Sequence, residues 1–472
     1  MSRLELRARK DLLLETAGLG LALVACAVLY LRGIGGAANY DEGVYLASLD
    51  ALRHGQNLGS DVFASQPPGF YLLLRLAAAI TGNGLDALRA AFIASALVGL
   101  LAAYVIGRSL AGRIGGFTAL AVCALAPPFP TLAGRIEADP PATTLALVAI
   151  ALAFAASGRR ERPALAFSSG AVFALAVSVK LLAVTALVPL VAIAVSRSLS
   201  RRSLIPALAG TGAVVAAFLV AYGGVLGDLW NQVVSFHLDS RDAGPGLGDN
   251  AHRVAHFLDL RTPFAWLAIA SAVTALGLLV RGKRVGTHPL WLWALAAALF
   301  LVFQRPLLDH HLVLLAAALA LAAGTTLAAS IRIASRQRAR VACAFVVLFT
   351  SAGVVQESRR LERDSVPEAL QVALAAAAIR EASTPDELVV TDLPIVAYEA
   401  GRRVPGELVD TSAVRFASGS LTGARVMETI RTEHVRVVLV GREFENVPGL
   451  ESSLRKRFGA PKPIGSFRLY LR

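Results

Sequence analysis

The sequence is poor in charge and in cysteine. Only 17% of its 472 residues are charged and 56% are hydrophobic, whereas a soluble domain averages about 25% charged and about 45–50% apolar residues. One globular core cannot bury so large an apolar excess, so the composition excludes an ordinary soluble protein. Cys26, Cys123 and Cys343 each lie inside an apolar run, which excludes a disulfide framework and a Cys-x-x-Cys metal site.

The sequence also lacks the charge pattern of a nucleic-acid-binding protein. Its net charge is +13, but the basic residues form short clusters between apolar runs, with no cationic stripe interleaved with aromatic residues. Leu and Ala dominate the apolar runs, which do not alternate polar and apolar residues as barrel strands do. We therefore predict an all-α polytopic membrane protein with no nucleic-acid partner.

Long apolar runs are what the sequence has in abundance. A helix needs about 20 residues to cross about 30 Å of hydrocarbon. The first run is too long, and followed by too many others, to be a cleaved signal peptide. The sequence predicts about eleven transmembrane helices, at 13–31, 90–107, 114–129, 140–157, 163–179, 181–196, 204–226, 263–280, 288–303, 312–330 and 341–356.

Every second loop between these runs is basic. The positive-inside rule assigns such loops to the cytoplasm, so we expect a cytoplasmic N-terminus and, after an odd number of spans, an extracytoplasmic C-terminal region. The basic clusters are Arg3, Arg7, Arg9 and Lys10; Arg108 and Arg113; Arg159, Arg160 and Arg162; Arg197, Arg201 and Arg202; Arg281, Lys283 and Arg284; and Arg332, Arg336, Arg338 and Arg340.

The chain is predicted to have two domains. Residues 1–356 form the transmembrane domain, with a first outer loop at 33–88 and a second at 227–262, the second being a flexible loop or a mobile lid. Residues 357–472 have the composition of a soluble, extracytoplasmic α/β domain. The first loop carries amphipathic helices at 42–54 and 68–81, and the C-terminal domain carries helices at 367–382, 394–400 and 424–433 and strands at 387–391, 436–440 and 466–471.

Carboxylates and imidazoles gather in the predicted outer loops. The clearest local pattern is Asn39-Tyr40-Asp41-Glu42-Gly43-Val44-Tyr45, directly after the first span. Adjacent carboxylates at a membrane surface are costly to desolvate, and one with a raised pKa suits a general base. The alternative is structural: Asp41 is the N-cap of the following helix and Glu42 favours its dipole.

Two further patterns follow in the outer loops. Gln66-Pro67-Pro68-Gly69 predicts a helix start. Arg135-Ile136-Glu137-Ala138-Asp139 precedes the fourth span, where Asp139 is either a functional carboxylate or an N-cap.

Four features follow one another along the chain: Asp-Glu-Gly-x-Tyr, Pro-Pro-Gly, Arg89 and Arg-x-x-x-Asp. In this order they resemble the sequence pattern of the GT-C glycosyltransferases. Within them, the chain looks closest to the protein O-mannosyltransferase and aminoarabinose-transferase-like branch of bacteria, over residues 1–330. The resemblance implies a multi-pass protein of the bacterial inner (plasma) membrane. It also implies inverting transfer of a hexose or pentose from a polyprenyl-phosphate-linked donor on the outer leaflet to a glycan, lipid or protein acceptor of the envelope.

The resemblance assigns roles to individual residues. The family's first-loop acid falls on Asp41 as the catalytic base, with Glu42 as the neighbouring candidate, and its second-loop acid falls on Asp139. Tyr45, Arg135 and Glu137 are expected to contact substrate. Gln66 stands where a basic residue is common in relatives, which puts one phosphate contact in doubt.

The leaving group is an anionic lipid phosphate, which needs cations more than it needs a proton donor. Each candidate also has a structural explanation: Lys180 can extend to the lipid headgroups, and the segment from Arg305 to His311 can anchor a helix end at the interface. The expected donor-phosphate ligands are Arg89, Lys180, Arg305, His310 and His311.

We expect no cofactor and no metal site, although the histidine pair could bind a divalent ion. The alternatives to an enzyme are a lipid or polysaccharide transporter or flippase, and a non-catalytic envelope scaffold. A transporter places ionisable residues near the bilayer midplane, often in two related halves, whereas here the spans are nearly free of charge.

Overall fold

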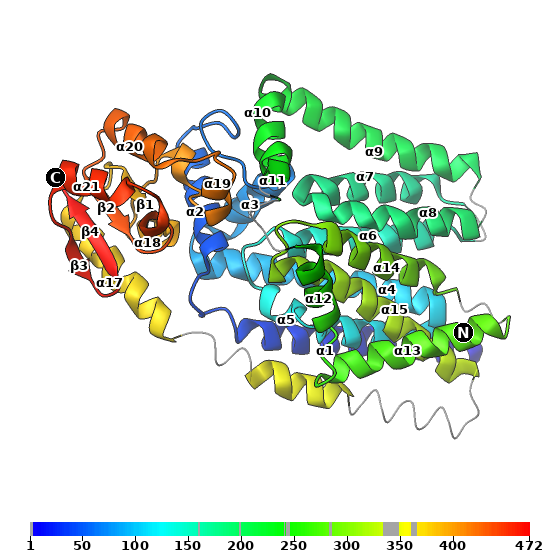
Figure 1. Ribbon diagram of the computed structural model, residues 1–472. Helices are drawn as coiled ribbons and strands as arrows, with labels where there is room; N and C mark the ends of the chain where they lie inside the picture. Colours follow the sequence, from blue (N-terminus) through cyan, green and yellow to red (C-terminus); the bar gives the residue numbers. More distant parts are fainter. Residues whose placement is uncertain are drawn as a thin grey trace. The chain divides into compact units, whose positions relative to one another are not determined.

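The structure is a computed structural model that describes residues 3–158, 161–197, 200–239, 241, 246–282, 286–333, 349–359 and 366–472 (Figure 1). The chain divides into two compact units. Unit 1 comprises 1–34, 81–218 and 247–363, and unit 2 comprises 35–80, 219–246 and 364–472. The predicted boundary at residue 356 stays a prediction.

Unit 1 is a bundle of apolar helices. Six helices in the described part of the chain are long and apolar enough to cross a membrane, and several shorter apolar helices accompany them. The predicted fold class, helical and polytopic with a small C-terminal sheet, is confirmed. The main helices of this unit are α1 (Arg3–Leu31), α4 (Leu85–Ala124), α6 (Asp139–Ala156), α7 (Pro163–Val179), α8 (Leu187–Ser196), α9 (Arg201–Tyr222), α13 (Pro263–Val280), α14 (His288–Phe303) and α15 (Leu312–Ile333).

The two predicted spans 90–107 and 114–129 correspond to two helices that meet at a break within α4, although the second helix ends at Ala124. The backbone of α4 leaves helical geometry at Ala111 and at Gly112, where φ is +68°, a region open to glycine. A Cβ on Gly107 would lie 2.2 Å from the carbonyl oxygen of Gly115, so glycine lets the two halves approach closely. The predicted span 341–356 lies partly outside the described residues.

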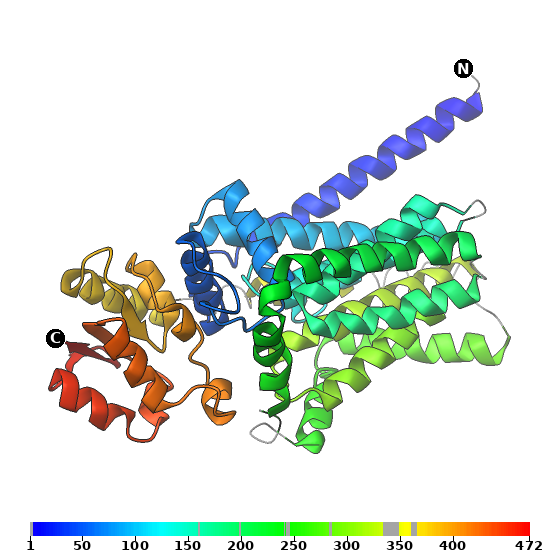
Figure 2. The same cartoon turned by 90° about the horizontal axis from the view of Figure 1, so that it is seen from above.

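The core of unit 1 surrounds α15, which packs against α4, α6, α13 and α14. In the most apolar stretch of α15, 89% of residues are buried, against 11% in α1. Figure 2 shows the N-terminal part of α1 extending away from the other helices. Ala is frequent along α15, and small residues allow close packing between helices in a bilayer.

Unit 2 combines three separate stretches of chain. The first carries the predicted amphipathic helices, α2 (Tyr40–Arg53) and α3 (Pro68–Thr81). The second is helical, with α10 (Leu226–Trp230), a π-helix η3 (Asn231–Ser235) and α11 (Phe236–Asp239). The predicted second outer loop, 227–262, contains these helices and also α12 (Leu247–His256) of unit 1, and its place on the outer face stays a prediction. Gly244 and Pro245 of that segment lie outside the described residues.

The third stretch forms a four-stranded sheet in the order β1-β2-β4-β3. Strand β1 (Val389–Thr391) pairs in parallel with β2 (Val437–Val440), which pairs antiparallel with β4 (Phe467–Leu471), and β3 (Lys462–Ile464) forms the other edge. The accompanying elements are α17 (Val366–Ala382), α18 (Pro394–Glu399), η6 (Gly406–Leu408), α19 (Ala413–Ala417), α20 (Gly423–Thr432) and α21 (Leu450–Phe458).

The six elements predicted for the C-terminal region are present within one or two residues of their expected ends. Helices α19 and α21 and strand β3 were missed because they are short and lack a clear apolar period. The sheet is tied at Asp392, whose carboxylate accepts hydrogen bonds of 2.8–2.9 Å from the backbone amides of Gly441, Arg442 and Phe444. Burial raises the pKa of this carboxyl, and the three amides oppose that shift.

Helix α2 packs against α18 at a glycine. A Cβ on Gly43 would lie 2.6 Å from the backbone nitrogen of Ile395 and 3.0 Å from its Cβ. Backbone atoms cannot give way as a flexible side chain can, so residue 43 must be glycine for this packing.

We expect Gly43→Ala to lower the free energy of unfolding by about 1–3 kcal/mol through overpacking. Gly227→Ala is the matched control, because it lies in α10 with nothing within 4 Å of its added Cβ, and it should be neutral or slightly stabilising. Denaturant unfolding of the detergent-purified proteins, followed by circular dichroism, measures both. Equal stabilities for the two variants would contradict the assigned packing.

Candidate functional site

The motif with Asp41 and Glu42 lies at the start of α2, and the N-cap of this helix is Asn39. The Asn39 Oδ1 accepts a hydrogen bond of 2.8 Å from the backbone amide of Glu42, and the Glu42 Oε2 accepts one of 3.2 Å from the amide of Asn39. This is a capping box. The N-cap interpretation of Asp41 is therefore wrong, although the Asn-x-x-Glu spacing in the sequence already carried the correct signal.

The two adjacent acids differ in environment. Glu42 is fully buried, and one of its carboxylate oxygens is held by the cap. Asp41 occupies the second position of the helix and is partly exposed. Glu42 therefore has a structural role that Asp41 does not share.

Tyr45, expected to contact substrate, is buried within unit 2. Its hydroxyl accepts a hydrogen bond of 3.0 Å from Gln66 Nε2, and its ring meets that of Phe70 edge-on, with centroids 4.5 Å apart. Tyr45 thus holds the Gln-Pro-Pro-Gly segment against α2. Any contact of Tyr45 with substrate stays a prediction.

Sequence analysis missed the environment of Tyr40. Its hydroxyl lies 3.2 Å from Asp410 Oδ1 and accepts a hydrogen bond of 2.8 Å from the backbone amide of Thr411. The guanidinium of Arg442 lies over its ring, 4.5 Å from the centroid. Burial raises the pKa of Tyr40 well above its usual value, so this tyrosine stays protonated and fixes the start of α2.

In unit 1, Asp139 is the first residue of α6 and makes no cap hydrogen bond, so its N-cap interpretation is also wrong. Its Oδ2 lies 3.2 Å from Lys180 Nζ and 3.9 Å from His310 Nε2. Asp139 is only 4% exposed. A carboxylate buried this deeply requires a partner of opposite charge, and Lys180 supplies it.

Lys180 lies where helix α7 ends and the short helix η1 (Leu181–Ala186) begins, in extended backbone with φ −151° and ψ 125°. Its side chain is buried, so extension toward lipid headgroups is wrong. His310 and His311 lie in the turn η5 (Asp309–His311) before α15. The Nδ1 of His311 accepts a hydrogen bond of 3.3 Å from the amide of Leu308, which leaves Nε2 to carry the proton of the neutral ring.

We call Asp139, Lys180, His310 and His311 the buried polar cluster. Its members come from three places in the sequence and meet at helix ends. Ligand atoms of Asp139, His310 and His311 lie within 4.8 Å of one another, and two imidazoles with a carboxylate suit a divalent ion such as Zn²⁺. The ammonium of Lys180 competes for the same carboxylate oxygen.

Among the remaining predicted residues, Glu137 has a carboxylate oxygen within 4.8 Å of a ring nitrogen of His310, which brings it beside the buried polar cluster. Arg89 on α4 is 1% exposed and donates a hydrogen bond of 2.6 Å from Nη1 to the carbonyl of Ile34. Arg135 and Glu137 precede α6, where the amide of Glu137 donates to the carbonyl of Arg135 at 2.9 Å. Arg305 is half-buried, between α14 and η5.

Glu42→Ala should lower the free energy of unfolding by about 0.5–2 kcal/mol, because it removes half of the capping box. Glu42→Gln should keep both stability and activity, since glutamine also completes the box. Thermal unfolding and a sugar-transfer assay test the pair. Loss of transfer in Glu42→Gln with unchanged stability would make Glu42 a catalytic carboxylate.

Lys180→Met should lower the free energy of unfolding by about 3–5 kcal/mol, because it leaves the Asp139 charge buried without its ammonium partner. The double variant Asp139→Asn with Lys180→Met should recover part of that loss, giving a coupling of about 1–3 kcal/mol. The free energy of unfolding of each variant, measured in mixed micelles, completes the double-mutant cycle. The exposed pair Asp86→Asn and Lys10→Met is the control cycle, and additive effects at 139 and 180 would contradict the pairing.

Known proteins are similar to this chain in part of its sequence and in its fold. Residues 65–222 match the family model described as dolichyl-phosphate-mannose-protein mannosyltransferase. No curated protein matches the chain in sequence. The fold is similar to ArnT from Cupriavidus metallidurans bound to undecaprenyl phosphate, with a TM-score of 0.71 and 13% identity over 96% of this chain and 98% of that one.

Two archaeal structures are similar over a smaller part of their own length. The apo oligosaccharyltransferase of Archaeoglobus fulgidus gives a TM-score of 0.57 and 14% identity, over 90% of this chain and 70% of that one. AglB from Archaeoglobus fulgidus, in complex with an inhibitory peptide and a dolichol-phosphate, gives a TM-score of 0.55 and 13% identity, over 96% of this chain and 74% of that one. The predicted resemblance is confirmed: this chain has the fold of the GT-C glycosyltransferases, in a form like that of ArnT.

Proposed function

We propose that this protein is an inverting glycosyltransferase that moves a hexose or pentose from a polyprenyl-phosphate-linked donor to an envelope acceptor. The observation that carries the proposal is the buried polar cluster of unit 1. Ionisable side chains are expensive inside an apolar bundle and mark functional sites there. The cluster combines one carboxylate with one ammonium and two imidazoles, which favours an anionic group as its ligand.

The cations of the cluster suit the departing lipid phosphate. As the bond from the anomeric carbon to the phosphate oxygen breaks, negative charge grows on that oxygen. Lys180 and the N–H groups of His310 and His311 can stabilise that charge through charge-assisted hydrogen bonds, without a proton donor. In this scheme Asp139 holds Lys180 in place, with Nζ 3.2 Å from Oδ2, and Arg89 and Arg305 are additional phosphate ligands.

The acceptor hydroxyl needs a base, and we assign that role to Asp41. Asp41 removes the hydroxyl proton, the acceptor oxygen bonds to the anomeric carbon, and polyprenyl phosphate leaves from the opposite face, which inverts the configuration. Two features support Asp41 over Glu42. Glu42 is held by the capping box, whereas Asp41 is partly exposed.

The donor class is inferred from the likeness of fold. The similar structures include ArnT bound to undecaprenyl phosphate and AglB bound to a dolichol-phosphate. For this chain we propose a polyprenyl-phosphate sugar, a glycan, lipid or protein acceptor, and the bacterial inner membrane with the N-terminus cytoplasmic. Tyr45, Arg135 and Glu137 are proposed substrate contacts, and the reaction is proposed to need no cofactor.

Purified wild type should transfer sugar from polyprenyl-phosphate-linked donors, and Asp41→Asn should lower kcat by about 10²–10⁴-fold, because asparagine cannot take the proton. Transfer of radiolabelled sugar in detergent or nanodiscs measures both. Asp86→Asn, at an exposed acid in the first turn of α4, is the control with the same chemical change and should match the wild type.

Equal activity in wild type and Asp41→Asn would remove Asp41 from the mechanism. A wild type that transfers nothing from any polyprenyl-phosphate donor, while remaining folded, would refute the transferase itself. Movement of the lipid-linked sugar across a vesicle membrane without transfer would instead identify a flippase.

A further inference from the structure

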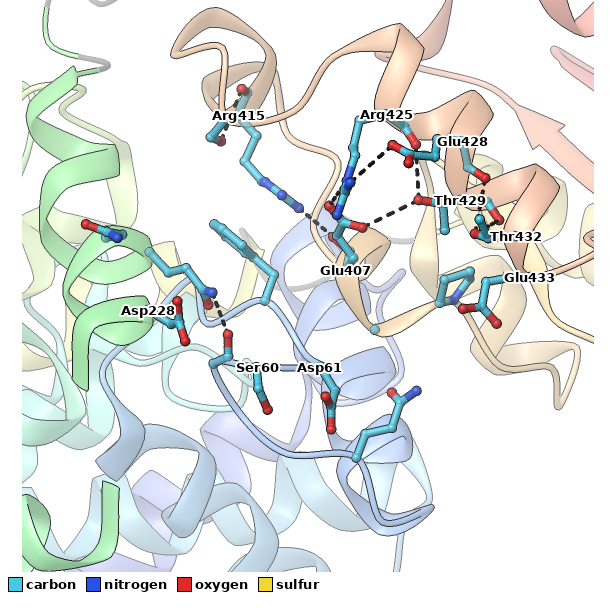
Figure 3. A pocket seen from close by; sticks show the side chains of 18 of the residues that line it. Ser60, Asp61, Asp228, Glu407, Arg415, Arg425, Glu428, Thr429, Thr432 and Glu433 are labelled. Carbon is cyan, nitrogen blue, oxygen red and sulfur yellow. Dashed lines mark hydrogen bonds and ion pairs between the residues drawn. The ribbon is translucent and has the colours of Figure 1, made fainter. Parts of the chain in front are cut away.

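Unit 2 contains a polar cavity of about 860 Å³ that the proposed chemistry does not use. Its walls come from three stretches of chain: the loop 56–63 after α2, the helical segment 228–236, and the C-terminal elements η6, α19 and α20 (Figure 3). A cavity of this size is typical of a small-molecule binding site. Most such sites are lined by apolar side chains, whereas polar groups dominate this one.

The walls of the cavity are fixed by hydrogen bonds. The amide of Phe63 donates to the carbonyl of Gly406 at 3.0 Å. Gln232 bridges the loop, donating from Nε2 to the carbonyl of Gly59 at 2.7 Å and accepting at Oε1 from the amide of Ala64 at 2.7 Å. The cavity is therefore preformed, which reduces the ordering cost of binding.

Both guanidinium groups in the lining are already engaged by acids or carbonyls. Arg425 Nε lies 2.6 Å from Glu407 Oε1, and its Nη1 lies 3.1 Å from Glu428 Oε2. Arg415 Nη1 donates at 2.7 Å to the backbone carbonyls of Glu407 and Asp410. Figure 3 shows the Arg415 side chain reaching toward Glu407.

Three carboxylates of the lining make no ion pair with a cationic side chain among the described residues. Asp228 and Glu433 are exposed and make no side-chain hydrogen bond within the described part of the chain. Asp61 accepts hydrogen bonds from the backbone and side chain of Asn57, which is uncharged. An anionic ligand would meet repulsion from all three.

Two polar atoms of the lining are buried without a hydrogen-bond partner in the described chain: Arg415 Nε and Gln56 Oε1. Arg415 is only 2% exposed, and its guanidinium lies over the Phe63 ring, 3.7 Å from the centroid. Unsatisfied buried donors and acceptors are costly, and a ligand or water that pairs with them recovers that cost. Both atoms are buried in the wall, so the groups of the cavity that a ligand meets first are its exposed carboxylates.

The spacing of the acidic side chains in the cavity favours a polyhydroxylated ligand over a metal ion. Groups of three metal-ligating atoms within 4.8 Å of one another, among the residues that the structure describes, include none from this cavity. Hydroxyl groups donate short, strong hydrogen bonds to separated carboxylates, and Ser60, Asn231 and Thr432 add neutral partners. Phe236 contributes an apolar surface to the same wall.

We propose that this cavity binds an uncharged glycan segment. Asp61, Asp228 and Glu433 accept hydrogen bonds from the sugar hydroxyls, and the cavity rejects anionic glycans. Its use as the acceptor subsite of a transferase rests on the function proposed above, but glycan binding does not.

Binding is measured on full-length protein in detergent with no donor present, by saturation-transfer NMR and calorimetry. The probes are neutral trisaccharides (maltotriose, mannotriose and triacetylchitotriose), anionic trigalacturonate and the cationic glucosamine trimer. At least one neutral trimer should bind with an affinity that salt does not change. Asp228→Asn with Glu433→Gln should weaken that binding about tenfold or more.

The matched control is Asp239→Asn with Glu381→Gln, which makes the same chemical changes at exposed acids of unit 2 outside the cavity lining. It should bind as the wild type does. Failure of every neutral trimer to bind would overturn the proposal, as would equal binding by the cavity variant and the wild type. Salt-sensitive binding of the glucosamine trimer alone would identify a cation site, and equal binding of trigalacturonate would refute the charge selection. All of these results stand whether or not the protein transfers sugar.

Discussion

The ion pair between Asp139 and Lys180 is the interaction on which the candidate chemistry of unit 1 depends. Neither charge is tolerable alone in an apolar bundle, where desolvation costs several kcal/mol per ion. At 3.2 Å the pair offsets much of this cost, and it links the start of α6 to the end of α7.

The pair also explains how a cation can be kept ready for an anionic ligand. The carboxylate of Asp139 offsets part of the cost of burying the ammonium of Lys180. Under the proposed function, an arriving phosphate would replace the carboxylate of Asp139 as the anionic partner of Lys180. The neighbouring imidazoles of His310 and His311 widen the surface available to that anion, so binding and leaving-group stabilisation can share one set of side chains.

Unit 2 is stabilised in a different way, because its polar residues are not part of the apolar helix bundle of unit 1. Here rigidity comes from backbone hydrogen bonds and caps: Asn39 and Glu42 fix the start of α2, Asp392 ties two strands, and Gln232 holds the loop after α2. A rigid frame lets uncompensated carboxylates remain exposed in a preformed cavity. Charge left unpaired on such a frame is available for a ligand.

The sequence by itself determined the helices, the sheet-bearing C-terminal region and the concentration of acids and histidines in the loops. These features follow from runs of neighbouring residues, since the hydrophobic effect and the span length act along the local chain. The Asn39 cap was also readable, since its Glu partner is three residues away. Only the tertiary structure decided which polar residues meet. Asp139, Lys180 and His310 are far apart in sequence, and the walls of the cavity come from three separate segments, so their pairing depends on how helices and loops pack, which no local pattern encodes.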